Sequence, residues 1–394
     1  MRGRRSVDPD RDRTMTDRTD PAFRFDLRDF NGALGDIGTL LPLTLGAIAL
    51  VGLSAQTVLM GFGLVYIASG LIYRLPVPVQ PMKAIAAVAL VGGVTPGAMA
   101  MAGVAIGLIL VVLGSSGVID RIARLVPQSV MSGLQLGLGV ALGWLALTLM
   151  AGQPLIAAVS LAVAAAALRR GTHAALAALL CGAALGWIAG HPGLAPEAAP
   201  HAGTWPPALP VADDLRVALF DLALPQLALT VTNAVFLTVL VAGDSFGARA
   251  ATVTPRRLCL TSGAANLLLA PLGALPMCHG AGGLAAHHRF GARTGGAPIM
   301  LGAVLMALAF LPHEIRGPAL QAIPAATLGA LLLIAAIELG ASRRLIDARP
   351  SCRPVIAVTA AMTLIANPLI GLVAGTMAEI ARKLILSQRR AKQE

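Results

Sequence analysis

Two short stretches with the same plan, LPVPVQPMKAIAA at 75–87 and ALPMCHGAGGLAA at 274–286, lie about half a chain apart. In the first, the two early prolines favour an extended backbone, because the residue before a proline is pushed out of the helical region. Pro81 suits the first turn of a helix, where its missing N–H costs nothing. A helix over 81–92 would be about 18 Å long, roughly half of a membrane. Each stretch therefore predicts an extended approach followed by a half-helix.

The composition excludes an ordinary soluble enzyme. Of the 394 residues, 56% are hydrophobic and 12% are charged, with a mean hydropathy of +0.78, whereas soluble domains carry about 25% charged residues. One protein core cannot bury so many apolar side chains, so lipid must cover the remainder. The formal net charge of +11 does not indicate nucleic-acid binding, because aromatic residues make up only 4% and are not interleaved with basic ones. The sequence predicts an all-α polytopic membrane protein.

Apolar runs separated by glycine, proline and charge predict fourteen membrane segments. The first repeat, 25–190, would contain segments near 31–53, 56–73, 81–92, 96–114, 128–150, 153–168 and 173–190. The second repeat, 214–386, would contain segments near 217–241, 257–271, 279–289, 297–312, 324–340, 355–366 and 369–386. The segments at 81–92 and 279–289 are too short to cross a hydrocarbon core of about 30 Å.

The distribution of basic residues predicts the orientation. If all segments alternate and the N-terminus is cytoplasmic, nearly all of the 30 Lys and Arg residues fall on the cytoplasmic side, as the positive-inside rule requires. Residues 1–24 would then be a disordered cytoplasmic tail, 191–213 an extracytoplasmic loop free of Lys and Arg, and 387–394 a second cytoplasmic tail. The first tail has no apolar stretch typical of a signal peptide, and Met15 is an alternative start to Met1. The expected location is the cytoplasmic (inner) membrane.

Matching residues recur at nearly one separation along the chain. The matching pairs are Pro78 with Pro276, Pro127 with Pro324, and Asp36 with Asn233. Because each half holds seven segments, an odd number, the second half must enter the membrane from the opposite side. Inverted repeats are typical of secondary transporters, and short interrupted segments in corresponding positions indicate the substrate site. The sequence thus predicts a 7+7 inverted repeat whose third and tenth segments are half-helices.

Two half-helices entering from opposite faces would direct their N-termini at each other. Each N-terminus offers unpaired N–H groups and about half a positive charge, which favours an anion. Lys83 adds a full charge in the first turn of the earlier half-helix, and a lysine in hydrocarbon costs at least about 3 kcal/mol. We expect a bound anion to compensate it. A fixed salt bridge with Asp36 is the structural alternative, and both could hold if Asn31 or Thr39 orients that carboxylate.

Each of the other polar residues in the segments admits a functional and a structural interpretation. Gln80 could donate its amide N–H to the anion or cap a helix. His279 could donate from its ring or carry a proton, and a satisfied structural histidine is equally expected. Asn233 could reach the site, although a hydrogen bond between helices is the ordinary role of a membrane asparagine. Glu379 lies towards a segment end, where a solvated or interfacial position is expected.

The residue pattern does not indicate a metal site, a cofactor site or an enzyme. The four cysteines match neither a disulfide framework nor a metal knuckle. The adjacent His287 and His288 do not have the spacing of a metal pair, and the glycines at 280–283 lie outside any nucleotide-binding unit. No pattern of nucleophile and base is present. We expect no metal, no cofactor and no enzymatic activity.

Three stretches resemble signature motifs of the molybdate transporter family, distant relatives of the sulfate and nucleobase permeases. They are NGALGDIGTLLPL at 31–43, PVPVQPMKAIAA at 76–87 and GALPMCHGAGGLAAHHRFGARTG at 273–295. The resemblance implies uptake of the tetrahedral oxyanion molybdate and a fourteen-segment fold. It also implies a substrate-carrying core of the first four and the eighth to eleventh segments, with the rest as a gate. The predicted substrate-binding residues are Gln80, Pro81, Met82, Lys83, Cys278, His279, Gly280, Ala281 and Gly282, with Asp36, Thr39 and Asn233.

The expected function is import of molybdate by a secondary active transporter that works by alternating access. A transporter of sulfate or another oxyanion is the first alternative, and a nucleobase permease or an anion channel ranks lower. Moving a dianion inward costs about 4.6 kcal/mol per 100 mV, so proton coupling through Asp36 or His279 is a hypothesis. The expected partners are the oxyanion, membrane lipid and, as a further possibility, a second copy of the chain in a homodimer.

Overall fold

The computed structural model describes residues 21–91, 94–125, 127–190, 212–312, 314–316, 318, 322–341, 343–366 and 368–391. The predicted tail at 1–24, apart from its last four residues, and the predicted loop at 191–213, apart from its last two, lie outside the described residues. Helices make up nearly all of the described chain, and one short two-stranded sheet is present in that part.

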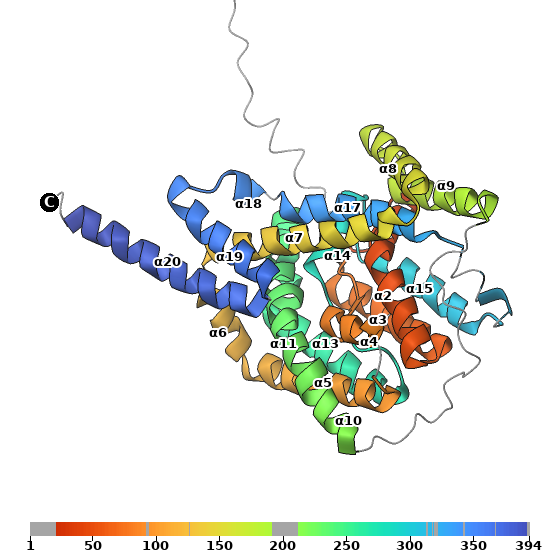
Figure 1. Cartoon of the computed structure of the whole chain (residues 1–394), viewed down its shortest axis with the longest axis horizontal. Coiled ribbons are helices and arrows are strands. Elements are labelled where there is room, and N and C mark those ends of the chain that lie inside the picture. Colours follow the sequence, from red (N-terminus) through yellow and green to blue (C-terminus); the bar gives the residue numbers. More distant parts are fainter. Residues whose placement is uncertain are drawn as a thin grey trace, which may run out of the picture.

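Every predicted segment of the first half coincides with a helix or a pair of helices (Figure 1). These are α1 (Leu27–Leu34) with α2 (Ile37–Val51), α3 (Ala55–Tyr73), α4 (Lys83–Val91), α5 (Pro96–Ser116), α7 (Gln128–Ala151), α8 (Pro154–Arg169) and α9 (Ala174–Ile188). Side chains of Ser54 and Thr95 cap the N-termini of α3 and α5, as expected for these residue types. An additional amphipathic helix, α6 (Val118–Leu125), follows α5.

The second half begins with one continuous helical rod. It consists of α10 (Ala212–Arg216), η1 (Val217–Ala223), α11 (Leu224–Leu229), η2 (Thr230–Leu237) and α12 (Thr238–Phe246), of which η1 and η2 are π-helical. The remaining elements are η3 (Gly247–Thr252), α13 (Pro255–Leu269), η4 (Ala270–Leu272), α14 (Ala281–Arg289), α15 (Gly296–Phe310), α17 (Ala325–Gly340), α18 (Arg343–Ile346), η5 (Pro350–Cys352), α19 (Arg353–Ile365) and α20 (Pro368–Ala391). The last helix therefore extends into the predicted tail at 387–394.

Four of the described helical runs are long and apolar enough to cross a membrane. They are α3, α5, α7 and the rod over 214–252. Others, including α8, α9 and α15, are equally apolar but shorter. The chain is therefore a helical multi-pass membrane protein, and helix length alone identifies fewer spans than the hydropathy and charge pattern predicts.

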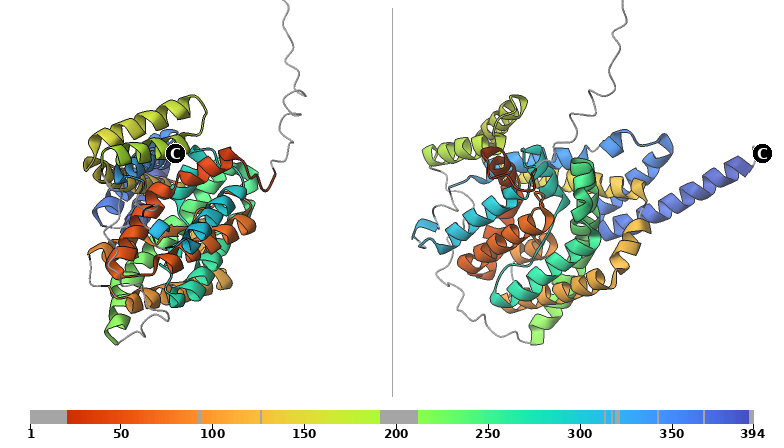
Figure 2. Two further views of the ribbon diagram at one scale, coloured as in Figure 1. Left: turned by 90° about the vertical axis from the view of Figure 1, so that its right-hand side faces the viewer. Right: turned by 180° about the vertical axis from the view of Figure 1, so that it is seen from behind.

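The two halves of the chain interlock. Helix α3 packs on α15, α5 on α13 and α7 on α17, so the closest-packed helix pairs join the first half to the second (Figure 2). Glycines allow the close approach: a Cβ at Gly63 would lie 2.9 Å from the carbonyl oxygen of Gly302, and one at Gly107 would lie 3.0 Å from that of Gly263. Such contacts hold membrane helices together where lipid removes the usual hydrophobic drive.

The two half-helices begin later than the sequence predicts. Helix α4 begins at Lys83 instead of Pro81, and α14 begins at Ala281 instead of His279. The preceding residues form two strands, β1 (Gln80–Pro81) and β2 (Met277–Cys278), which pair with each other. Each helix has nine residues, about 13 Å, and so cannot cross a membrane alone.

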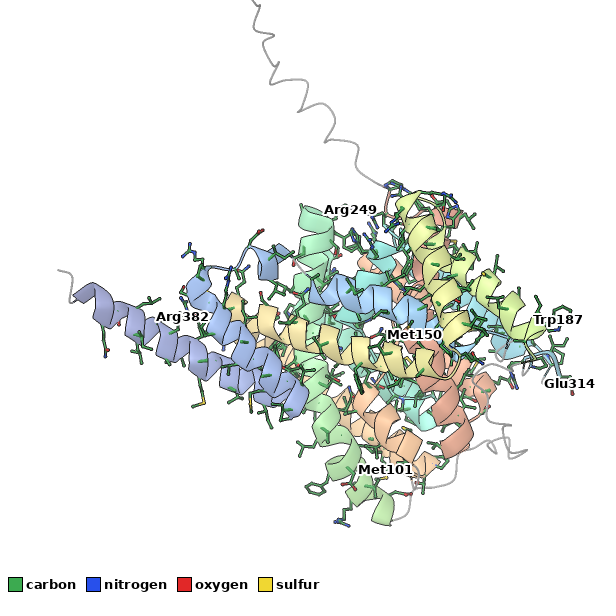
Figure 3. The ribbon with its side chains drawn as sticks, turned by 45° about the horizontal axis from the view of Figure 1, so that its top comes forward. Met101, Met150, Trp187, Arg249, Glu314 and Arg382 are labelled. Atoms are coloured by element: carbon green, nitrogen blue, oxygen red, sulfur yellow. The ribbon has the colours of Figure 1, made fainter. Side chains whose placement is uncertain are left out.

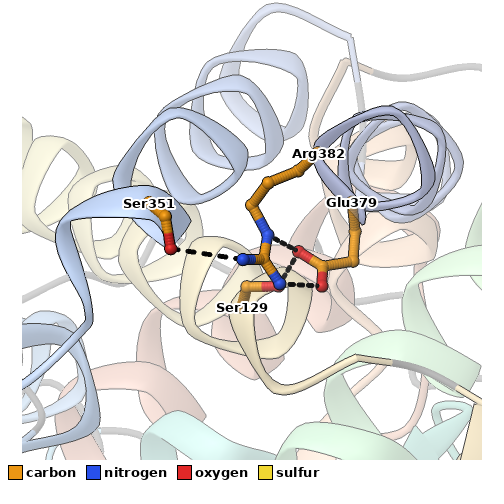
Figure 4. Close-up of polar contacts among 4 residues, drawn as sticks. All are labelled: Ser129, Ser351, Glu379 and Arg382. Atoms are coloured by element: carbon orange, nitrogen blue, oxygen red, sulfur yellow. Dashed lines mark hydrogen bonds and ion pairs between the residues drawn. The ribbon is translucent and has the colours of Figure 1, made fainter. Parts of the chain in front are cut away.

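Helix α20 contains an ion pair that is hydrogen-bonded to α7 and η5, and its C-terminal part then extends away from the bundle (Figure 1). Glu379 is 3% exposed and accepts hydrogen bonds from Nε and Nη2 of Arg382, at 2.9 and 2.6 Å. The Ser129 hydroxyl of α7 donates to Glu379 at 2.9 Å, and Arg382 Nη1 donates to Ser351 Oγ at 3.2 Å (Figure 4). Glu379 is therefore not solvated, because α7 and α20 bury the carboxylate between them, and its interfacial position stays a prediction.

Candidate functional site

The antiparallel β1–β2 pair brings the two half-helices together. Gln80 pairs with Cys278 and Pro81 with Met277, and the Met82 N–H donates to the Pro276 carbonyl at 2.9 Å. Since antiparallel strands run in opposite directions, α4 and α14 leave the pair in opposite directions with their N-termini beside each other. Both helices lie inside the bundle (Figure 1).

Asp36 and Gln80 form a buried hydrogen bond at this junction. Asp36 lies at the break between α1 and α2, and its Oδ1 accepts from Gln80 Nε2 at 2.5 Å. The Tyr66 hydroxyl donates to Asp36 Oδ2 at 3.4 Å, and the Thr39 N–H donates to the backbone carbonyl of Asp36 at 2.9 Å. The Gln80 oxygen Oε1 is buried and has no hydrogen-bond partner among the described residues. The predicted grouping of Asp36, Thr39 and Gln80 is thus present.

Glycine is needed where Gln80 approaches α14. A Cβ at Gly280 would lie 1.9 Å from Gln80 Oε1. A Cβ at Gly283 would lie 2.6 Å from Gln80 Nε2 and 2.5 Å from Asp36 Oδ2. Any larger side chain at either position would displace the Gln80 amide. These glycines therefore let Gln80 approach the N-terminus of α14.

Lys83, the first residue of α4, has no hydrogen bond or ion pair with any residue that the structure describes. Asp36 and Cys278 lie near enough to interact with its charge, but no salt bridge to Asp36 forms. The alternative of a fixed Lys83–Asp36 pair is therefore not what the structure contains. A half-buried ammonium without a direct partner is costly in a membrane protein, which favours an anionic ligand.

The two helix N-termini differ in how their N–H groups are used. At α4, Gln226 Oε1 accepts from the N–H of Ala84 at 2.8 Å and from that of Ile85 at 3.4 Å, while its Nε2 donates to Thr230 at 2.9 Å. At α14, no side chain caps the helix, and within the described chain the N–H groups of residues 281–283 have no hydrogen-bond partner. The open donors are therefore concentrated at α14, and the charge is on α4.

Gln226 is a site residue that the sequence analysis did not identify. It is 1% exposed and lies in α11, within the predicted segment 217–241. A glutamine inside an apolar membrane segment must find partners in the protein, so its polarity was the available signal. The donor that it meets, the N–H of Ala84, lies 142 positions away in the chain and could not be read from local pattern.

His279 is fully engaged by the protein. Its Nδ1 donates to the Pro78 carbonyl at 2.8 Å, because a carbonyl can only accept, and its Nε2 lies 2.8 Å from Thr261 Oγ1. The Tyr73 ring packs edge-on against the imidazole, with centroids 5.3 Å apart. His287 similarly uses Nδ1 to reach the Pro76 carbonyl at 2.8 Å. The two histidines brace the extended segment before α4.

The other predicted residues surround this junction. Met82 and Cys278 are buried. Asn233 lies one turn after Thr230 in η2, is 4% exposed, and its side chain has no hydrogen bond to the described residues. Asn31 does not orient Asp36: its amide donates to the Phe290 carbonyl and accepts from the Leu176 N–H instead.

Comparison with known proteins identifies relatives across most of the chain. The family model described as "Molybdate transporter of MFS superfamily" matches residues 28–142 and 218–339. Molybdate transporter 1 of Arabidopsis thaliana is 29% identical, over 91% of this chain and 89% of that protein. Molybdate transporter 1 of Chlamydomonas reinhardtii is 31% identical, over 79% of this chain and 82% of that protein. Molybdate transporter 2 of A. thaliana is 30% identical, over 79% of this chain and 77% of that protein.

Solved structures share the fold at low sequence identity. The transmembrane domain of the cyanobacterial bicarbonate transporter BicA aligns with a TM-score of 0.59 at 18% identity, over 88% of this chain and 96% of that domain. Murine solute carrier 26 family member A9, an anion transporter in the inward-facing state, aligns with a TM-score of 0.59 at 13% identity. The alignment covers 98% of this chain and 77% of that protein. The fold is therefore that of these transmembrane domains.

Proposed function

The chain belongs to the molybdate transporter family, and from that premise we propose that it imports molybdate as a secondary active transporter working by alternating access. The proposal is supported most directly by one observation. The Lys83 ammonium has no direct partner in the described protein, and it lies beside the uncapped N-terminus of α14.

In this proposal the oxyanion lies between the two half-helices. Lys83 supplies a full positive charge, and the open N–H groups of Ala281, Gly282 and Gly283 supply directed donors at the positive end of the α14 dipole. Gly280 gives the ligand access to the backbone. Pro81, Met82 and Cys278 form the surrounding wall, and Asn233 offers an amide from η2.

Asp36 and Gln80 would couple a proton to the oxyanion. While Asp36 is ionised, it accepts from Gln80 Nε2, and the amide oxygen then faces Gly280, where it repels an anion. A protonated Asp36 would donate to that oxygen instead, because the amide can turn over. Nε2 would then point towards α14 and donate to the oxyanion. Protonation and anion binding would each favour the other.

The structure favours Asp36 over His279 as the proton carrier. Both ring nitrogens of His279 are occupied by Pro78 and Thr261, so we assign the histidine to bracing. Asp36 in contrast contacts Gln80, which touches the N-terminus of α14. Gln80 would therefore connect the Asp36 carboxylate to the proposed anion, with one hydrogen bond on each side of its amide.

We further propose the 7+7 inverted topology with both termini in the cytoplasm. The agreement of all predicted segments with helices, the half-helices in corresponding positions and the interlocked halves support it. The first four and the eighth to eleventh segments would carry the substrate, and the others would form the gate. The Arg-rich face would be cytoplasmic.

Uptake of molybdenum by cells expressing the protein tests the function. We expect saturable uptake by the wild type, loss of about tenfold or more in Lys83→Ala because a charge-assisted contact is removed, and partial retention in Lys83→Arg. Arg121→Gln, which removes an exposed charge of α6, is the matched control and should transport normally. Equal uptake by wild type and Lys83→Ala would remove Lys83 from the mechanism.

Competition by tungstate and sulfate separates molybdate from the other oxyanions. Tetrahedral dianions share shape and charge, so the helix ends and Lys83 attract all three, and selectivity must arise from the wall of the site. We expect molybdate uptake to fall least with sulfate. Stronger inhibition by sulfate than by unlabelled molybdate would make the protein a sulfate transporter.

A further inference from the structure

A slot of about 410 Å³ lies between α3 and α13, within the range of small-ligand pockets. Its lining residues fall within 64–72 of α3 and 260–269 of α13, with His279 beside them. The Tyr73 hydroxyl lies 2.7 Å from Thr261 Oγ1 at one end, and a Cβ at Gly61 would lie 3.9 Å from Leu269 Cδ1 at the other. The two helices are therefore antiparallel here, and the slot runs along them for about 12 Å.

The lining of the slot is almost entirely apolar. Every described lining residue is aliphatic apart from Ser69, Thr261 and His279, and none of them is an acidic residue, a lysine or an arginine. Such a lining gives a charged ligand nothing to replace its lost hydration. The slot therefore suits an uncharged, apolar ligand.

The three polar side chains of the lining are occupied by protein partners. Ser69 donates to the Val77 carbonyl at 2.7 Å. His279 donates from Nδ1 to the Pro78 carbonyl at 2.8 Å, and its Nε2 lies 2.8 Å from Thr261 Oγ1. Because these hydrogen-bonding groups are engaged within the described chain, a ligand in the slot would be held by apolar packing.

The mouth of the slot lies among side chains that face lipid. Leu64 and Ile72 of α3 are 44% and 45% exposed, and Leu268 of α13 is 70% exposed. Helix α3 is one of those long and apolar enough to cross a membrane, and exposed apolar side chains of such a helix contact hydrocarbon. The surroundings of the mouth are therefore lipid acyl chains.

We propose that this slot binds one acyl chain of a membrane lipid. A slot that follows two helix axes fits a linear chain, because membrane helices and acyl chains both run roughly along the bilayer normal. The aliphatic lining supplies dispersion contacts along the whole chain. A bound chain would pack against Ser69 and His279, which hold the extended segment before α4, and would stabilise the folded protein.

Photolabelling with a defined lipid tests this site. The probe is a phosphatidylcholine with a diazirine in its acyl chain, added in increasing amounts to the purified full chain in detergent, with unlabelled phosphatidylcholine as the competitor. Mass spectrometry identifies the labelled peptides. Helix α9, where Trp187 is 87% exposed and points away from the bundle (Figure 3), is the reference for lipid that merely coats the surface.

Two substitutions fill the slot in graded steps. Ala264→Leu and Ala264→Phe enlarge an exposed residue of the lining, and Ala184→Phe makes the matched change at an exposed position of α9, outside the slot. We expect saturable labelling of 64–72 and 260–269 in the wild type and in Ala184→Phe. Labelling should be at least about tenfold weaker in Ala264→Phe, as for the loss of about two buried methylene groups. Ala264→Leu should fall in between.

The proposal is overturned if labelling of the slot rises in proportion to the probe and resists competition, as expected for the surface of α9. It is also overturned if Ala264→Phe is labelled as the wild type is, with its folding verified by the thermal midpoint. Should that variant not fold, unchanged labelling of Ala264→Leu has the same meaning. A wild-type dimer that Ala264→Phe converts to a monomer, measured by light scattering, would mean that a second copy of the chain covers the slot instead of a lipid.

Discussion

The Gln80 amide lies between a carboxylate and the end of a helix. Its Nε2 reaches Asp36 at 2.5 Å, and its oxygen is close enough to α14 that only glycine fits at position 280. The amide has a donor end, Nε2, and an acceptor end, Oε1. When one end faces Asp36, the other end faces α14. One side chain thus links a titratable group to the proposed anion.

The substitution Asp36→Asn tests this link. The asparagine amide can donate to Gln80 Oε1 at every pH and so imitates the protonated acid. In the wild type we expect molybdate binding to weaken as pH rises and Asp36 ionises, by about tenfold across the titration. In Asp36→Asn the binding should remain strong at alkaline pH, while uptake against a gradient is lost. Binding and uptake are measured on the same preparations across a pH series.

The alternative that His279 carries the proton is tested by a separate substitution. His279→Gln keeps a side-chain donor for the Pro78 carbonyl but cannot titrate, so it should retain the wild-type pH profile even if the protein is less stable. A flat profile in His279→Gln, with a normal profile in Asp36→Asn, would assign the proton to the histidine instead.

At the scale of elements, the two half-helices pair through β1 and β2 and yet differ in how their N-termini are capped. Gln226 from α11 caps α4, whereas α14 has no cap. A capped N-terminus has fewer open N–H groups for a ligand, and an uncapped one in a buried site requires a partner. The asymmetry assigns the charge of the site to α4 and the hydrogen-bond donors to α14.

The substitution Gln226→Met tests the cap. It removes the acceptor of the Ala84 N–H and leaves a buried donor unsatisfied, which costs about 1–3 kcal/mol. We expect a lower thermal midpoint for the purified protein. Gln128→Met, which changes an exposed glutamine at the start of α7, is the matched control. If both variants unfold at the wild-type temperature, the Gln226 bond contributes no stability.

At the scale of the whole molecule, the distribution of arginines is the basis of the proposed orientation. Arg170 lies in the exposed α8–α9 turn, and the proposed topology puts this turn in the cytoplasm. The same topology puts the segment 191–213 outside.

Labelling of intact cells with an impermeant maleimide checks this orientation. Ala202→Cys should be labelled above the wild-type background, and Arg170→Cys should be labelled only after the cells are permeabilised. A fluorescent protein fused to the C-terminus should be fluorescent, because it remains in the cytoplasm. The reverse labelling pattern would invert the topology, and equal labelling of both positions would contradict it.

The apolar helices and the two half-helices were predictable from the sequence, because hydropathy and proline placement are local properties, whereas the role of Lys83 stays a prediction. The family resemblance on the motifs at 31–43, 76–87 and 273–295 is confirmed by relatives over most of the chain. The burial of Glu379 was not foreseen because Ser129 on α7, its hydrogen-bond partner outside α20, is distant in sequence.

The tertiary structure alone decided how these parts meet. The register of Gln80 against Cys278, the Gln226 cap on α4 and the bracing of Pro78 by His279 each join residues from opposite halves of the chain. No local pattern encodes such pairings, because a buried polar group is satisfied by whichever partner the packing brings near it. Composition and periodicity therefore determined what inserts into the membrane, and packing determined which buried donors and charges remain available for a ligand.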